Sequence, residues 1–210
     1  MTIDQTRFDQ AIARFDAANA EDPNRELADG RAQPKELIYA QRLSAMLARF
    51  DPQASEALRL AARCQHIRRW TIPRADYPRT PAGYKQWRSR LQKFHAETAA
   101  GMLREVGYDA QTVARVESLL RKEKLKLDPE VQALEDVVDL VFLESYLEDF
   151  VAKQPDYDEA KWIDILKKTW FKMSPRGRRA ALSMIRLPGK LLPVIMKAAE
   201  LGERMDPNPK

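Results

Sequence analysis

Two aspartates lie three residues apart inside an apolar stretch, LEDVVDLVFLE, at residues 134–144. A helix of this composition has no wide polar face, and a helix that is apolar on all sides is normally buried. Asp136 and Asp139 would then lie on neighbouring parts of one helix face, where two ionised carboxylates repel each other. An ionised carboxylate without a partner is so costly to bury that it usually takes up a proton instead. The stretch therefore predicts a divalent cation, a hydrogen-bond donor or a basic side chain opposite the two acids.

The two histidines of the chain, His66 and His95, are predicted to lie in helices of the core. Each of them alone is more typical of a structural histidine whose ring nitrogens have hydrogen-bond partners. Together with the two aspartates, they form a set of imidazole and carboxylate groups that is typical of a metal site. A metal or catalytic centre is therefore one interpretation of these residues.

The buried acids also have a structural interpretation. In it, Asp139 pairs with an arginine such as Arg63 or Arg69, and Glu135 faces the solvent. A buried ion pair and a catalytic centre both shift the pKa of a carboxylate. The residue types therefore leave the two interpretations open.

A basic segment with interleaved aromatic rings runs from Arg68 to Lys93, with eight basic residues against one acid, Asp76. Basic side chains neutralise phosphate and aromatic faces stack on bases, so the segment suits a nucleotide, another phosphorylated metabolite or single-stranded RNA. The predicted substrate-binding residues are Arg68, Arg69, Arg74, Lys93, Trp70 and Tyr84. The alternative is a solvated surface on which the rings hold a proline-rich loop against the core.

Composition and missing motifs exclude several classes of protein. The net charge of +5 favours anionic partners, and the single cysteine, Cys64, excludes an internal disulfide and a multi-cysteine zinc site. The sequence lacks the glycine-rich phosphate loops and the HExxH and GxSxG motifs. It shows neither a signal peptide nor an apolar run of membrane-spanning length, so we expect a soluble cytoplasmic protein without a membrane partner.

Hydrophobic spacing predicts helices along the chain and requires no strand. Residues 20–33 are predicted to form a loop, and a helix is predicted from Asp51-Pro52 to about Trp70. Further helices are predicted to start at Thr80-Pro81 and at Ser174-Pro175, because a hydroxyl followed by proline is typical of a helix start. The predicted fold is all-α, a compact irregular helical bundle.

The length of 210 residues suits one domain with an appended segment. We expect a single helical domain over residues 1–186, with its core at about residues 34–173. Residues 187–210 are predicted to form a C-terminal helical tail, which is apolar with interspersed lysines.

Two stretches, LRLAARCQHIRRW and FHAETAAGMLREVGYDAQTVARVESLL, carry a resemblance to known families. The order of these helices resembles the HD-domain superfamily of metal-dependent phosphohydrolases. More closely, the chain from about PKELIYAQRL to KTWFKMSPRG resembles a bacterial and fungal family catalogued only as a domain of unknown function. Some members of that family carry a glutamyl-tRNA synthetase label, for which this sequence shows no nucleotide-binding α/β pattern.

Compared with the HD superfamily, the metal-binding His-Asp doublet falls on Gln65 and His66, and the upstream histidine falls on Tyr39. The histidine at a helix start matches His95, and the closing aspartate matches Asp136. Two of the usual ligand positions are therefore altered, which argues against a standard two-metal centre.

The resemblance implies one divalent metal ion, Mn, Fe, Ni or Zn, held by His66, His95 and Asp136, with Glu97 or Asp139 as the proton relay. The predicted function is a diverged HD-like metal-dependent phosphohydrolase that acts on a nucleotide or a small phosphorylated metabolite. One alternative is a catalytically inactive helical module that binds RNA or a nucleotide through the basic segment. Another is a protein-interaction scaffold whose C-terminal run LPGKLLPVIMKAAELGERM docks on the domain, on a partner or in a homo-oligomer.

Overall fold

The computed structural model describes residues 5–204, which are mainly helical. The chain divides into two compact units, residues 1–131 and 132–210, and each is described by itself. The predicted all-α fold is confirmed, with one small exception near the N-terminus. The predicted division into a domain at 1–186 and a tail at 187–210 stays a prediction.

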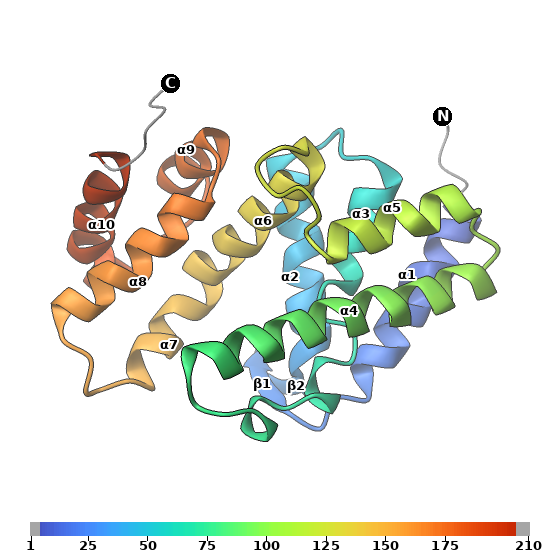
Figure 1. The fold of residues 1–210 in the computed structure, drawn as a ribbon, viewed down its shortest axis with the longest axis horizontal. Coiled ribbons are helices and arrows are strands. Elements are labelled where there is room, and N and C mark those ends of the chain that lie inside the picture. The colour runs from blue at the N-terminus through green and yellow to red at the C-terminus, as the bar shows by residue number, and fades with distance from the viewer. Residues whose placement is uncertain (1–4, 205–210) are drawn as a thin grey trace. The chain divides into compact units, whose positions relative to one another are not determined.

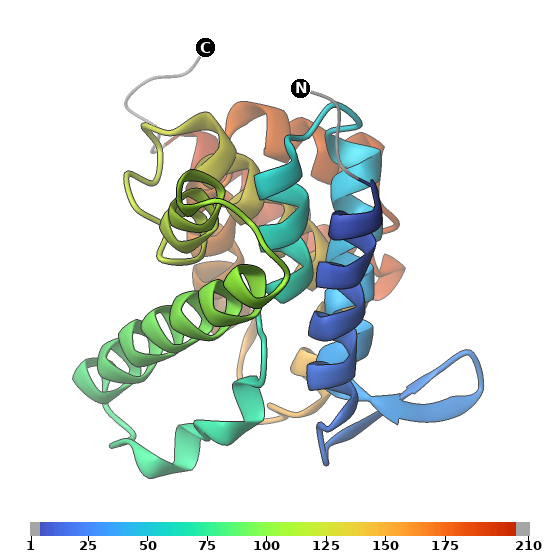
Figure 2. The ribbon, with the colours of Figure 1, turned by 90° about the vertical axis from the view of Figure 1, so that its right-hand side faces the viewer.

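The helices of the first unit are α1 (Gln5–Ala20), α2 (Lys35–Phe50), α3 (Glu56–Cys64), α4 (Pro81–Glu105) and α5 (Ala110–Leu120). α1, α2 and α3 pack against one another, and α5 packs against both α3 and α4 (Figures 1 and 2). The core consists of apolar side chains that include Phe15, Leu43, Leu58, Leu60, Ile67, Leu103 and Leu119. Burial of these apolar helix faces stabilises the unit more than the intrinsic helix propensity does.

The predicted start of α4 is confirmed. Pro81 is the first helical residue, where its missing N–H costs no hydrogen bond, and the Thr80 hydroxyl accepts a hydrogen bond from Gly83 N at 3.1 Å. α5 starts in the same way, because the carboxylate of Asp109 accepts from Thr112 N at 2.9 Å. Local side-chain chemistry therefore sets the first turn of both helices.

The prediction of a loop at residues 20–33 is wrong in part, because the segment contains a β-hairpin. Antiparallel strands β1 (Arg25–Ala28) and β2 (Arg31–Pro34) pair, with Ala28 opposite Arg31. Asp29 and Gly30 have φ angles of +50° and +73°, which is typical of the tight turn that an Asp-Gly pair favours. Both strands contact α2, and Glu26 forms an ion pair with Arg42 of that helix.

The third helix is shorter than predicted. α3 begins after its cap residue, Ser55, and ends at Cys64. Arg68 has a φ of +48°, a left-handed conformation that turns the chain away from the helical path, and its N–H donates to Asn19 Oδ1 at 3.0 Å. The chain continues in two 3-10 turns, η1 (Arg69–Thr71) and η2 (Arg74–Asp76).

α6 (Pro129–Val141) begins in the last residues of the first unit and continues into the second. The second unit then contains the π-helical turn η3 (Phe142–Tyr146), α7 (Leu147–Ala152), α8 (Glu159–Lys172), α9 (Pro175–Ser183), the 3-10 turn η4 (Gly189–Leu191) and α10 (Leu192–Arg204). α10 packs against α8, and Trp170 and Ile195 are buried in the unit. None of the described helices is both long enough and apolar enough to cross a membrane.

Asp136 of α6 is held by the start of α9. Its Oδ1 accepts hydrogen bonds from Ser174 N at 2.7 Å and from Gln132 Nε2 at 3.0 Å, and its Oδ2 accepts from the Ser174 hydroxyl at 2.5 Å. Burial raises the pKa of Asp136, and the hydrogen bonds from Ser174 and Gln132 oppose that shift. This buried acid therefore has hydrogen-bond donors as partners, and the start of α9 at Ser174-Pro175 is confirmed.

Gly177 in α9 lies so close to Asp136 that a side chain does not fit. A Cβ added to Gly177 would lie 2.6 Å from Asp136 Cγ. We expect Gly177→Ala to lower the free energy of unfolding by about 2–4 kcal/mol, which urea denaturation measures. The matched control is Gly101→Ala in α4, where a Cβ meets no heavy atom within 4 Å and should stabilise the helix by about 0.5–1 kcal/mol. Equal stability of the two variants would contradict the close packing at Asp136.

Candidate functional site

A pocket of about 420 Å³ lies in the first unit, between β1, the start of α2, the turns η1 and η2, and α4. Its wall contains four basic side chains and one acid, together with two tryptophans. The lining residues are Asn24, Arg25, Lys35, Glu36, Arg69, Trp70, Ile72, Pro73, Arg74 and Trp87. We call this site the basic pocket.

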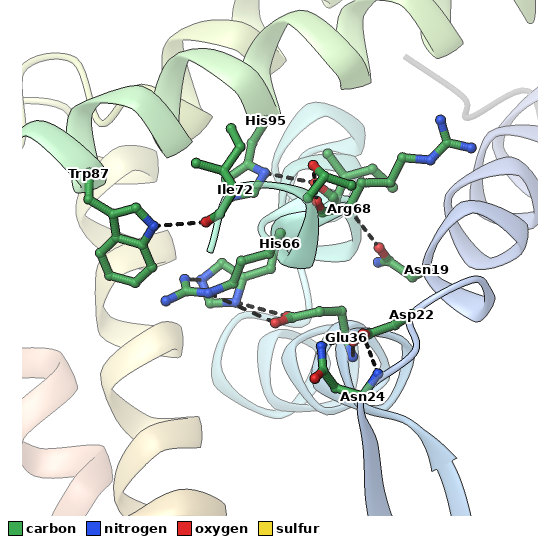
Figure 3. A network of polar contacts seen from close by, with 12 residues as sticks. Asn19, Asp22, Asn24, Glu36, His66, Arg68, Ile72, Trp87 and His95 are labelled. Atoms are coloured by element: carbon green, nitrogen blue, oxygen red, sulfur yellow. Dashed lines mark hydrogen bonds and ion pairs between the residues drawn. The ribbon is translucent and has the colours of Figure 1, made fainter. Parts of the chain in front are cut away.

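Trp87 fixes the turn that carries the arginines of the basic pocket. It comes from α4, is 8% exposed and donates a hydrogen bond from Nε1 to the carbonyl oxygen of Ile72 at 2.9 Å (Figure 3). The guanidinium carbon of Arg69 lies 4.8 Å from the centre of the Trp87 ring, and that of Arg74 lies 5.9 Å from it. The ring therefore attracts both cations to one wall.

Arg74 is also held by the backbone. Its Nη1 donates to the Tyr77 carbonyl and its Nη2 to the Pro78 carbonyl, both at 2.8 Å. The ring of Tyr84 lies 5.9 Å from the same guanidinium carbon. A guanidinium fixed in this way loses little rotamer freedom when an anion binds to it.

Glu36, His66 and Arg69 form a chain of polar contacts, and Glu36 and Arg69 line the basic pocket. Figure 3 shows Glu36 and His66 side by side. His66 Nδ1 lies 3.2 Å from Glu36 Oε2, and Arg69 Nη1 lies 2.9 Å from His66 Nε2. Burial and the charge of Arg69 hold the pKa of His66 well below its ordinary value, so the ring is neutral. Nδ1–H then donates to Glu36, while Nε2 accepts from Arg69. The Tyr39 ring stacks on His66 with ring centres 4.1 Å apart.

Glu36 is the acid that faces these cations. Burial raises its pKa from 4.5 to about 7, against the opposing effect of Arg69, whose Nε lies 3.9 Å from Glu36 Oε1. Asp22, which raises this pKa further, accepts a hydrogen bond from the Glu36 N–H through Oδ2 at 3.0 Å. Near neutral pH, Glu36 therefore exists in both protonation states.

His95 lies beside this chain of contacts, with its ring centre 5.8 Å from that of His66. Its Nδ1–H donates to the Ile67 carbonyl at 2.9 Å, and its Nε2 lone pair has no partner among the described residues. Burial lowers the pKa of His95 to about 3, so this ring is also neutral.

The described contacts do not fit a metal centre in the first unit. Both ring nitrogens of His66 are engaged, by Glu36 and by Arg69. Asp136 belongs to the second unit, where its oxygens accept hydrogen bonds from Ser174 and Gln132. Within residues 5–204 no group of three or more His, Cys, Asp or Glu side chains is placed so that it could hold a metal ion. Metal binding by His66, His95 and Asp136 stays a prediction.

Neither of the predicted relay residues, Glu97 and Asp139, is among the lining residues of the basic pocket. Glu97 is half-exposed on α4 and lies 3.8 Å from Lys93, one turn away. In the second unit, Asp139 Oδ1 and Glu135 Oε1 each lie 3.7 Å from Lys172 Nζ. Glu135 is 4% exposed, so the expectation that it faces solvent is wrong, because it extends from the buried face of α6 toward this lysine.

The two arginines named as partners of Asp139 each have other partners in the first unit, and a pair with Asp139 stays a prediction. Arg63 forms two hydrogen bonds of 2.6 Å with the carboxylate of Asp16, whereas Arg69 contacts His66 and Glu36. These partners lie far apart in the sequence, so residue spacing could not have indicated them.

Three of the six predicted substrate-binding residues line the basic pocket, namely Arg69, Trp70 and Arg74. Arg68 instead pairs with Glu21 at 3.1 Å. Sequence reasoning did not select Arg25 and Lys35, which the β-hairpin and the start of α2 bring to the pocket. The Asp-Gly pair at 29–30 was the available signal, because it predicts the hairpin that positions Arg25.

A family model described as "Domain of unknown function (DUF4202)" matches residues 9–195 of the chain. No curated protein and no solved structure matches it. The resemblance to a family of unknown function is thereby confirmed, whereas the resemblance to the HD superfamily and the synthetase label stay predictions.

Because the folded-state pKa of Glu36 lies above its ordinary value, its protonated form stabilises the folded chain. This stability is fully present below about pH 4.5 and is lost as the pH rises through about 7, in total on the order of 3 kcal/mol. We expect Glu36→Gln to remove this part of the pH dependence, measured by urea denaturation between about pH 5 and pH 8.

The control for Glu36→Gln is Glu97→Gln, which neutralises a half-exposed acid on α4. It should leave the slope of stability against pH as in the parent. A Glu36→Gln variant with the same slope as the parent would contradict the assignment of a near-neutral titration to Glu36.

Proposed function

The chain belongs to the family described as Domain of unknown function (DUF4202), and we propose that it binds a small phosphorylated ligand with an aromatic ring, such as a nucleotide. The observation that carries the proposal is the basic pocket, in which four cations and one acid surround a volume of about 420 Å³ beside two tryptophans. Pockets of this size typically bind small ligands and cofactors.

Charge supports phosphate as one part of the ligand. Arg69 and Arg74 are fixed on one wall by Trp87 and by backbone carbonyls. Arg25 and Lys35 add two more cations from β1 and the start of α2. Guanidinium groups bind phosphate oxygens through charge-assisted hydrogen bonds, which are stronger than neutral ones. When Glu36 is protonated, the acid no longer opposes an incoming anion.

Aromatic surface supports a base as the other part of the ligand. Trp87 is 8% exposed, so its ring mainly serves the arginines. Trp70 is only half-buried and lines the same pocket, so it offers a surface on which a base can stack. The volume of about 420 Å³ suits a single small molecule, and RNA is the other partner that the basic segment suggests.

A metal-dependent phosphohydrolase of the HD-like kind is a second candidate, and one observation favours it. The buried Nε2 lone pair of His95 has no partner among the described residues, although buried polar atoms usually have one. A metal ion or an ordered water would both satisfy it. Binding of a phosphorylated ligand by the arginines requires neither a metal ion nor an ordered water at His95. The described contacts therefore support the binding proposal better than the hydrolase candidate.

Arg25→Gln and Arg74→Gln are each expected to weaken binding of adenosine monophosphate about tenfold, since each removes a charge-assisted contact to phosphate. Isothermal titration calorimetry measures the affinity. Arg90→Gln on the exposed side of α4 removes the same charge outside the pocket and should bind as the parent does. Affinity that is unchanged in both pocket variants would overturn the proposal.

Salt dependence separates a nucleotide from RNA. Affinity for adenosine monophosphate should fall little with salt, whereas an RNA oligomer that contacts many phosphates would show a steep fall. A parent protein that binds only the oligomer, with a steep slope, would replace the nucleotide proposal by RNA binding.

Elemental analysis tests the hydrolase candidate. After incubation with Mn, Fe, Ni or Zn and removal of free ions, the binding proposal expects less than one bound metal ion per chain. One metal ion per chain in the parent, lost in a folded His95→Gln variant, would establish the second candidate instead.

A further inference from the structure

The four cations of the basic pocket form two pairs, and the first pair lies on the turns between α3 and α4. Arg69 of η1 and Arg74 of η2 have their guanidinium carbons 4.8 Å and 5.9 Å from the centre of the Trp87 ring. Arg69 has a carboxylate partner, because its Nε lies 3.9 Å from Glu36 Oε1. Arg74 instead donates to two backbone carbonyls, both at 2.8 Å. The first pair therefore keeps one positive charge that no acid balances.

The second pair lies where the β-hairpin meets α2. Arg25 of β1 is opposite Pro34 in the hairpin register, and the next residue, Lys35, donates its N–H to the Asn24 carbonyl at 3.0 Å. These backbone contacts bring Arg25 and Lys35 together at the wall of the basic pocket. Both residues are exposed, and neither side chain has a carboxylate partner within residues 5–204. The second pair therefore keeps two positive charges that no acid balances.

Among the described residues, Glu36 is the one acid in the lining of the basic pocket. Three other acids lie near in the structure or the sequence, and none of them lines it. Asp22 is 1% exposed and accepts a hydrogen bond from the Glu36 N–H, and Glu26 forms an ion pair with Arg42. Asp76 of η2 is exposed. With four cations and one acid, the lining carries an excess of three positive charges when Glu36 is ionised.

We infer that the ligand of the basic pocket carries at least two linked phosphoryl groups, as a nucleoside diphosphate or triphosphate does. This inference rests on the proposed function and narrows its ligand. A monophosphate brings at most about two negative charges at neutral pH, fewer than the excess of positive charge in the lining. A diphosphate brings about three, and its longer chain of oxygens reaches cations of both pairs.

Calorimetry with adenosine mono-, di- and triphosphate tests the inference on the whole chain in the presence of a chelator. The diphosphate and the triphosphate should each bind at least about tenfold more tightly than the monophosphate. Inorganic pyrophosphate should displace them better than inorganic phosphate does, because the preference comes from the phosphoryl chain and not from the base. Excess Mg²⁺ should weaken binding of the diphosphate, because it neutralises the charges that the arginines and the lysine recognise.

A matched pair of variants accompanies the titrations. Lys35→Gln removes one cation of the second pair and should reduce the preference for diphosphate over monophosphate severalfold, because the more highly charged ligand loses more. Lys153→Gln makes the same change at an exposed lysine of the second unit and should leave the preference as in the parent. Thermal unfolding checks that both variants are folded.

The outcomes separate this inference from the proposed function. A diphosphate that binds no more tightly than the monophosphate would overturn the inference and leave the proposed function in place. A parent protein that binds none of the three nucleotides would overturn both. The inference also fails if the preference for the diphosphate appears only with Mg²⁺, or if Lys35→Gln keeps the same preference as Lys153→Gln.

Discussion

The arrangement of the basic pocket depends on the contact between Arg69 and Trp87. Arg69 lies between the Trp87 ring, at 4.8 Å from its centre, and the neutral ring of His66, with Glu36 behind it. The guanidinium of Arg69 is half-buried, and a cation that is partly removed from water needs partners of this kind. Trp87 is in turn held by the Ile72 carbonyl, so α4, η1 and the start of α2 are connected through one side chain. Loss of the contact between Arg69 and Trp87 would therefore change the whole wall of the basic pocket, and not only one hydrogen-bond donor.

Arg69 also contacts the Nε2 atom that His66 would offer to a metal ion. In the HD-domain pattern, to which a likeness of this sequence stays a prediction, this region holds ligands for a cation. Here a guanidinium donates to His66 Nε2, so positive charge is already present and is supplied by the chain itself. Tyr39, at one of the altered positions, stacks on the His66 ring and holds it in place. Arginine in this position favours recognition of an anion, which is the chemistry that we propose for the adjoining pocket.

Local sequence signals predicted the parts of the fold that depend on neighbouring residues. Thr80-Pro81 and Ser174-Pro175 start helices because a hydroxyl can cap the first turn and proline needs no hydrogen bond there. The β-hairpin was missed because its strands are short and polar, although the Asp-Gly pair was visible in the sequence. Arg69, Trp70 and Arg74 were selected from their types, since basic and aromatic residues in one segment indicate phosphate and ring recognition, and they line the basic pocket. Their role in substrate binding stays a prediction.

The partners of the buried acids could not be found in this way. Glu36 contacts a histidine 30 residues later in the chain, and Asp136 accepts from a serine 38 residues later. The packing of the helices decides which residues form such pairs. A single sequence does not show that packing, so these pairs could not be predicted from it. The apolar stretch at residues 134–144 correctly predicted that its buried acids need partners. For Asp136, these partners include hydrogen-bond donors at the start of α9. Cytoplasmic location and homo-oligomer formation stay predictions.

The most direct measurement of the central claim is a titration of the protein with adenosine monophosphate, followed by NMR of the four tryptophan indole N–H groups. Trp70 and Trp87 line the basic pocket, whereas Trp162 and Trp170 belong to the second unit and serve as internal controls. The account predicts that the Trp70 and Trp87 signals shift with one common saturation curve, while the other two stay in place. Saturable binding that moves neither Trp70 nor Trp87, or no binding at all, would contradict it.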